Sequence, residues 1–136
     1  MVVDASVMIA WLLNEQHLSL GDEIYLLMAE RTISVPAHWP TEVGNALAIN
    51  LRRGRLQPAD LSAIDQRLGT LDVVVEPPPA VDLIKTMVTF AAQYGLSVYD
   101  AAYVMLARNT GLVLTTVDTD MRAAAQRLNI ALLPAG

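Results

Sequence analysis

The chain opens with Val2-Val3-Asp4-Ala5-Ser6, in which a short apolar strand meets an aspartate and then a helix. Asp4 stands directly after the apolar pair, and Ser6 is a suitable N-cap for a helix over residues 6–13. An aspartate is disfavoured at the end of an apolar strand, although it can hydrogen-bond the following turn. This junction predicts a strand whose carboxyl end carries a charged side chain.

The same alternation of strand and helix continues along the chain. Short apolar runs predict further strands at residues 33–35, 71–75, 112–115 and 130–133. Helical spacing of apolar residues predicts helices over residues 20–31, 41–53, 58–68, 81–94, 98–109 and 120–128. Strands that alternate with helices form a parallel sheet that is covered on both faces. We therefore expect an α/β fold, a three-layer α/β/α sandwich with a short, mostly parallel central sheet, in one domain over residues 1–136.

The composition is typical of a folded globular chain. It is 54% hydrophobic and has no cysteine, which excludes disulfides and thiolate chemistry. No basic leader precedes Asp4 and no apolar run is long enough for a membrane helix, so we expect a soluble, cytoplasmic protein. The net charge of −5 argues against a general nucleic-acid binder. A site that gathers carboxylates around cations is itself acidic, however, so a nuclease is not excluded.

Four acids fall where the carboxyl ends of the predicted strands meet. Asp4 ends the first strand, and Glu42 lies in the first turn of the helix after the second strand. Asp100 lies near the start of the helix over residues 98–109, and Asp118 follows the fourth strand. Taken singly, the last three are explained as acids that favour a helix start. Together they are more informative, because sites in open parallel sheets form beyond the carboxyl ends of the strands.

Carboxylates gathered at one edge repel one another. Each pair costs about 3 kcal/mol at a separation of about 5 Å and an effective dielectric constant of about 20. Such a cluster needs protonation or a bound cation, and carboxylate oxygens favour Mg²⁺ or Mn²⁺. Metals held in this way activate water and stabilise charge on a phosphate, which is phosphodiesterase chemistry. We expect Asp4 and Asp100 to be direct ligands, with Glu42 and Asp118 binding through water or holding a second ion.

At these residues the sequence resembles the PIN-domain family, and within it the VapC toxins of prokaryotic toxin–antitoxin pairs. The stretch Val2-Val3-Asp4-Ala5-Ser6 is similar to the family's first acid motif. The second, third and fourth motifs are matched, in the family's order, by residues 40–47, 96–103 and 114–121. Within the fourth motif Asp118 matches the family's acid, and Asp120 is the weaker candidate. The likeness runs through the whole chain.

The resemblance implies a metal-dependent endoribonuclease that forms a homodimer. It also implies inhibition by a cognate antitoxin protein, whose tail would lie in a groove near the acids. Ser6, Asn45 and Thr116 would support the site by orienting carboxylates and water. The alternative is a metal-free PIN-like module that only binds other proteins. The RNA target, the number of metal ions and the identity of the antitoxin stay open.

Other polar and aromatic residues have less specific interpretations. The only basic cluster is Arg52-Arg53-Gly54-Arg55. It could contact RNA phosphates or the antitoxin. The alternative is that these arginines only mark the C-terminus of a helix, where the helix dipole favours basic residues. His17 and His38 show no ligand spacing and are expected on the surface. Four aromatic residues could stack on RNA bases, but residues of this kind more often lie in the core or in dimer contacts, and we expect that here: Trp11, Trp39, Tyr99 and Tyr103.

Two other enzyme classes use an acid after the first strand. A phosphatase of the haloacid-dehalogenase type needs a second aspartate two residues later, and that position is Ser6. A phosphorelay receiver needs an acceptor aspartate after its third strand and a late lysine. The third strand here ends at Glu76-Pro77 and the only lysine is Lys85, so neither class fits.

Overall fold

A computed structural model describes residues 1–14 and 20–136. The described residues form a five-stranded sheet in the order β3-β2-β1-β4-β5, with every neighbouring pair parallel. The strands are β1 (Val2–Val3), β2 (Ile33–Val35), β3 (Val73–Val75), β4 (Leu114–Thr115) and β5 (Leu132–Leu133). The predicted parallel α/β sheet is therefore confirmed.

Helices fill the segments between the strands. They are α1 (Ala5–Leu12), α2 (Asp22–Glu30), α3 (Trp39–Arg52), α4 (Asp60–Gly69), the 3₁₀ helix η2 (Val81–Leu83), α5 (Ile84–Tyr94), α6 (Val98–Thr110) and α7 (Thr119–Arg127). None of the helices in the described part of the chain combines the length and apolar character that crossing a membrane requires. Their bounds lie close to the predicted ones, and α3 starts earlier because Pro40 is accommodated in its first turn.

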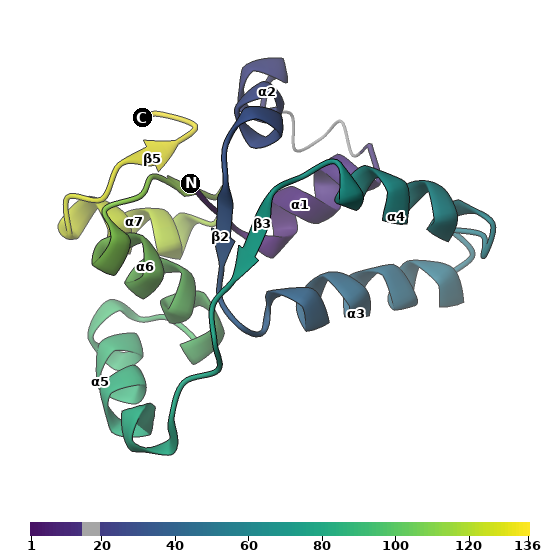
Figure 1. Ribbon diagram of the computed structural model, residues 1–136. Coiled ribbons are helices and arrows are strands. Elements are labelled where there is room, and N and C mark those ends of the chain that lie inside the picture. Colours follow the sequence, from purple (N-terminus) through teal and green to yellow (C-terminus); the bar gives the residue numbers. More distant parts are fainter. Residues whose placement is uncertain (15–19) are drawn as a thin grey trace.

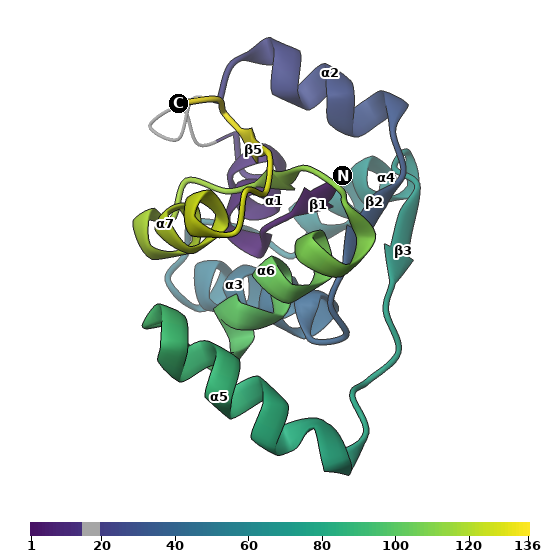
Figure 2. The ribbon, with the colours of Figure 1, turned by 90° about the vertical axis from the view of Figure 1, so that its left-hand side faces the viewer.

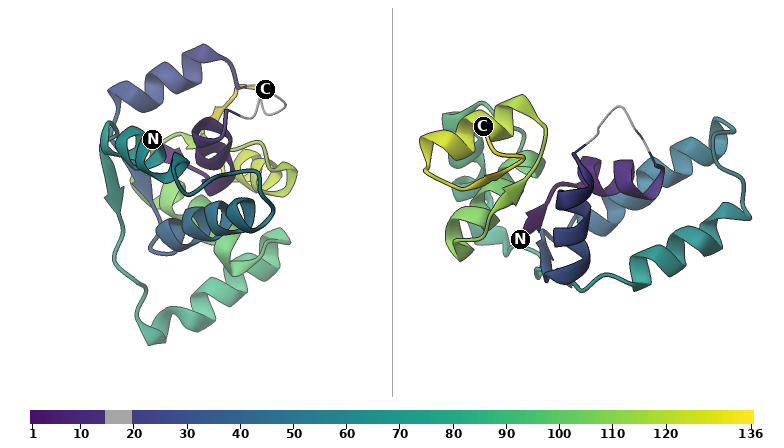
Figure 3. Two further views of the ribbon diagram at one scale, coloured as in Figure 1. Left: turned by 90° about the vertical axis from the view of Figure 1, so that its right-hand side faces the viewer. Right: turned by 90° about the horizontal axis from the view of Figure 1, so that it is seen from above.

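The helices cover both faces of the sheet. Seen from above, α1, α3 and α4 lie on one side of β1 and β2, and α5, α6 and α7 lie on the other (Figures 1 and 3). Helix α6 packs against β1 and β4, and α1 packs against α3. Val2, Val3 and Val104 are completely buried between these layers. This is the expected three-layer arrangement.

Strand β3 departs from the expectation that both faces of each strand are covered. Val74 and Val75 are 46% and 44% exposed, respectively. Because β3 is an edge strand, it lacks a neighbour on one side within the described residues. The prolines after it carry the chain away from the sheet to α5, which packs beside α6 (Figure 2).

The N-cap of α1 differs from the one expected from the sequence. Asp4, and not Ser6, is the N-cap, with extended backbone angles φ −62° and ψ 143°. The Asp4 side chain accepts a hydrogen bond from the backbone N–H of Ser6. Aspartate and serine are about equally good N-caps, so the choice depends on which residue has the non-helical backbone.

The parallel topology places four helix starts at one edge of the sheet. Helices that connect parallel strands run antiparallel to them, so their N-termini lie beside the carboxyl ends of the strands. Helices α1, α3, α6 and α7 begin at this edge. These are the helices whose first residues or caps are the four predicted acids.

Candidate metal centre

Asp4 is held rigidly at the end of β1. Its side chain is only 5% exposed, and its Oδ2 accepts hydrogen bonds from Ser6 Oγ at 2.7 Å and Thr116 Oγ1 at 3.0 Å. Burial raises the pKa of Asp4, the two hydroxyls oppose that rise, and the charge of Asp118 adds to it. The energetic cost of a buried carboxylate is thus only partly offset by its hydrogen bonds.

Thr116 connects Asp4 to Asp118. Its side chain is completely buried, and Oγ1 both donates to Asp4 and accepts from the backbone N–H of Asp118 at 3.1 Å. Asp118 in turn caps α7, because its Oδ1 accepts from the backbone N–H of Met121 at 2.8 Å. Asp118 is therefore a helix-start acid and also a neighbour of Asp4.

Glu42 projects from the first turn of α3 and is half-buried. Its Oε1 accepts a hydrogen bond from Tyr103 Oη at 2.8 Å. His38 Nε2 lies 2.8 Å from the same oxygen, but it is not aligned as a hydrogen-bond donor. Burial raises the pKa of Glu42, and the negative charges of Asp4 and Asp100 raise it further. The hydrogen bond from Tyr103 and the positive charge of His38 act in the opposite direction and lower it.

Asp100 lies in the first turn of α6. Ser97 caps this helix by accepting from the backbone N–H of Asp100 at 3.1 Å. Burial raises the pKa of the Asp100 carboxyl, and the negative charges of Asp118 and Asp4 raise it further. The structure thus brings acids from four distant stretches of chain within range of one another's charge.

The donor set fits a hard divalent cation in chemistry and charge. The acids supply only oxygen ligands, which hard cations prefer. Burial and mutual repulsion raise the pKa values of Asp4, Glu42 and Asp100, so a cation among these carboxylates would stabilise their ionised forms. Within residues 1–14 and 20–136, no three His, Asp or Glu side chains are arranged closely enough to hold an ion as they stand. Coordination at this edge would therefore need Asp100 or Asp118 to rotate toward Asp4 and Glu42, whose carboxylates are held by side-chain hydroxyls.

Two residues near the acids were missed by sequence reasoning. His38 was expected on the surface away from any site, but its imidazole lies against Glu42 and stacks edge-on against Tyr99 and Tyr103. Its position four residues before Glu42 is the signal that could have revealed this, because residues four apart share a helix face. Tyr103 has a comparable signal, three residues after Asp100. His17 lies outside the described residues.

The remaining predicted residues have mixed outcomes. Asn45 is exposed on α3, and no side-chain hydrogen bond joins it to another described residue, so its supporting role stays a prediction. Asp120 is exposed in the first turn of α7. Among the aromatic residues, Trp39 and Tyr103 lie in the core as expected, whereas Tyr99 is 65% exposed beside His38.

Several known proteins are similar to this chain in sequence or in architecture. The PIN domain family matches residues 1–127. Ribonuclease VapC3 of Pyrobaculum aerophilum is 30% identical over 122 residues, which is 89% of this chain and 91% of that protein. Exonuclease VapC9 of the same organism is 35% identical over 82 residues, or 60% of this chain and 59% of that protein. The crystal structure of PAE2754 from Pyrobaculum aerophilum has a TM-score of 0.64 and 27% identity, and the match covers 96% of this chain and 81% of that one.

Proposed function

The chain belongs to the PIN-domain family, and on that premise we propose that it is a VapC-type toxin, a ribonuclease that hydrolyses RNA phosphodiester bonds with Mg²⁺ or Mn²⁺. The main support is the group of acids at one sheet edge, where burial and mutual repulsion raise the pKa values of Asp4, Glu42 and Asp100. The names of the two relatives, a ribonuclease and an exonuclease, support nuclease chemistry. We treat residues 1–136 as one PIN domain and place the protein in the cytoplasm.

The acids divide into two groups in this proposal. Asp4 and Asp100 would bind the ion directly, and Glu42 and Asp118 would bind it through water or hold a second ion. Held by these residues, Mg²⁺ or Mn²⁺ would supply Lewis-acid chemistry for the hydrolysis of a phosphodiester. Ser6 and Thr116 fix the Asp4 carboxylate by their hydroxyl groups, so its position changes little when the surroundings change.

Cleavage of RNA in the presence and absence of the ion tests this function. With Mg²⁺ or Mn²⁺ we expect the wild-type protein to cut RNA, and we expect Asp100→Asn to lower kcat by roughly 100-fold, about 3 kcal/mol of barrier. Asp65→Asn, at an exposed position on α4, is the control and should cut as the wild type does.

The two functional alternatives give different results. Equal cleavage by wild type and Asp100→Asn would contradict the assigned site. A wild-type protein that cuts no RNA and binds neither ion by calorimetry would favour the metal-free interaction module.

We also propose a homodimer that forms through the segment after β3. Val81, Leu83, Ile84 and Val88 are 83%, 45%, 53% and 52% exposed, and exposed apolar groups of this kind mark interaction surfaces. We call these four residues the α5 patch. A second copy that contributes the same patch would cover it symmetrically.

Light scattering tests the α5 patch. We expect the wild type to be a dimer and Ile84→Glu to be a monomer, because a charge cannot be buried unpaired in an apolar interface. Leu26→Glu on α2 is the matched control, since Leu26 is also exposed, at 62%, but lies outside the patch. A dimeric Ile84→Glu protein or a monomeric wild type would contradict the proposal.

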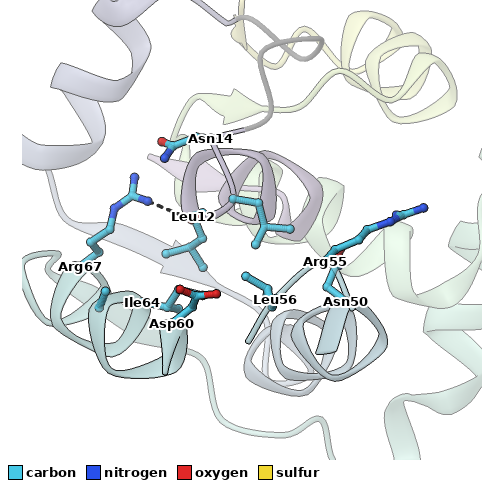
Figure 4. Close-up of a pocket in the computed structure, with 10 residues that line it drawn as sticks. Leu12, Asn14, Asn50, Arg55, Leu56, Asp60, Ile64 and Arg67 are labelled. Carbon is cyan, nitrogen blue, oxygen red and sulfur yellow. Dashed lines mark hydrogen bonds between the residues drawn. The ribbon is translucent and has the colours of Figure 1, made fainter. Parts of the chain in front are cut away.

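An antitoxin is the second partner that we propose. A pocket of about 500 Å³ lies between α4 and the C-terminal ends of α1 and α3, and Leu12, Leu56 and Ile64 line it. It is separate from the groove near the acids that the family resemblance implies for the antitoxin tail, because Asp4 and Glu42 lie at the opposite ends of α1 and α3. Arg55 stands at the rim of the pocket, whereas Arg67 is held by the backbone oxygens of Leu12 and Trp11 (Figure 4). This surface suits an amphipathic peptide, and it favours antitoxin over RNA as the partner of Arg55. A complex that leaves Arg55 as exposed as in the free protein would contradict this.

A further inference from the structure

The hydroxyl of Tyr103 lies where three of the site's segments meet. Tyr103 is on α6, one helical turn after Asp100, and its side chain is completely buried. The hydroxyl donates to Glu42 Oε1 at 2.8 Å, which links α6 to α3. Burial and the Glu42 carboxylate raise the pKa of the Tyr103 hydroxyl, and the backbone of Ala5, the residue after Asp4, opposes part of that rise as a hydrogen-bond partner of the same hydroxyl. A single phenol oxygen therefore contacts or adjoins the segments of Asp4, Glu42 and Asp100.

His38 closes the other side of the Glu42 carboxylate. Its ring lies edge-on to Tyr103 at a centroid distance of 5.4 Å, and its Nε2 is 2.8 Å from Glu42 Oε1. Because His38 is not aligned as a donor, the Tyr103 hydroxyl supplies the directed hydrogen bond to this oxygen. The orientation of Glu42 thus depends chiefly on Tyr103.

We propose that Tyr103 is a positioning residue, whose hydroxyl fixes the Glu42 carboxylate relative to Asp4 and Asp100 so that the three acids bind a divalent ion. This inference rests on the proposed metal centre. Tyr103 is not a catalytic residue, because its buried side chain has no access to RNA. Its ring belongs to the hydrophobic core, and its hydroxyl has a separate role at the site.

A purely structural role for the hydroxyl makes a different prediction. In that case removing it would lower the melting temperature and leave the affinity for metal unchanged. Tyr103→Phe separates the two roles, because it keeps the ring and deletes only the oxygen. Glu42→Gln provides the matching second variant, since the positioning role acts only through the Glu42 carboxylate.

The experiment measures Mn²⁺ affinity by calorimetry together with RNA cleavage. We expect Tyr103→Phe to weaken Mn²⁺ binding by about 10–100-fold and, at saturating Mn²⁺, to lower kcat without changing KM for RNA. In a Glu42→Gln background the same substitution should have little further effect on Mn²⁺ affinity. Tyr25→Phe, at a half-buried position on α2, is the control and should bind Mn²⁺ as the wild type does.

The outcomes distinguish this inference from the function on which it rests. Wild-type affinity for Mn²⁺ in Tyr103→Phe, or an equal loss in the wild-type and Glu42→Gln backgrounds, would overturn the positioning role alone. If the wild-type protein bound no Mn²⁺ and cut no RNA, the proposed function would fail together with the inference.

Discussion

Replacing Asp4 with asparagine is expected to lower kcat for RNA cleavage by about 10²–10³-fold while the fold stays intact. Asp4 is 5% exposed and is proposed as a direct ligand, so the loss of its charge removes about 3–4 kcal/mol of stabilisation from the transition state. Asparagine keeps a side-chain oxygen that can accept from Ser6 and Thr116, and it caps helices as well as aspartate does. Steady-state kinetics with Mn²⁺ measures the effect.

The stability of the same variant should change in the opposite direction. Because burial raises the pKa of Asp4, the ionised carboxylate opposes folding in the metal-free protein, and a neutral amide removes that cost. We expect a metal-free melting temperature for Asp4→Asn equal to or above that of the wild type. Asp22→Asn, an exposed acid in the first turn of α2, is the control. A cleavage defect that appears only together with unfolding would show that Asp4 has a structural role alone.

Removing the metal is expected to abolish cleavage and to lower the melting temperature by on the order of 10 °C at neutral pH. An ion that binds only the native state at about 100 times its Kd contributes about 2.7 kcal/mol, and each kcal/mol shifts the melting temperature of a domain this size by several degrees. Thermal melts with Mn²⁺ and with EDTA measure the shift. No shift at millimolar Mn²⁺ would contradict a metal centre at these acids.

The metal-free protein should also lose stability as the pH rises. Asp4, Glu42 and Asp100 have folded pKa values above their ordinary values of 3.8 and 4.5. Between the ordinary and the raised values, the native state holds protons that the unfolded chain has released, so stability falls with increasing pH in that window. Mn²⁺ should remove this loss at neutral pH, because it replaces the protons. A metal-free melting temperature that increases across the same window would contradict the account.

The sequence was sufficient to predict the sheet and the edge at which the acids meet. Short apolar runs separated by helical spacing leave few alternatives to a parallel sheet, and its strands share one carboxyl edge. Asp4, Glu42, Asp100 and Asp118 follow strands or begin helices, so local patterns placed them on that edge. Their metal-binding role stays a prediction, whereas their mutual proximity is a property of the fold.

Local sequence patterns could not give the hydrogen-bond partners of these acids, although the family resemblance implied that Thr116 orients carboxylates. The hydrogen bond from Thr116 to Asp4 joins residues 112 positions apart, and that from Tyr103 to Glu42 joins residues 61 positions apart. Helical and strand periodicities describe only near neighbours, so they carry no information on such pairs. The exposure of β3 was missed for a related reason, because strand order decides which strand lies at an edge.

The most direct test is an anomalous difference map from a crystal of the wild-type protein soaked in Mn²⁺. We predict one or two peaks among the carboxylates of Asp4, Glu42, Asp100 and Asp118, with Asp4 and Asp100 oxygens at about 2.0–2.2 Å from the ion. A map without a peak at this sheet edge, from crystals that hold Mn²⁺ elsewhere or not at all, would contradict the proposed metal centre.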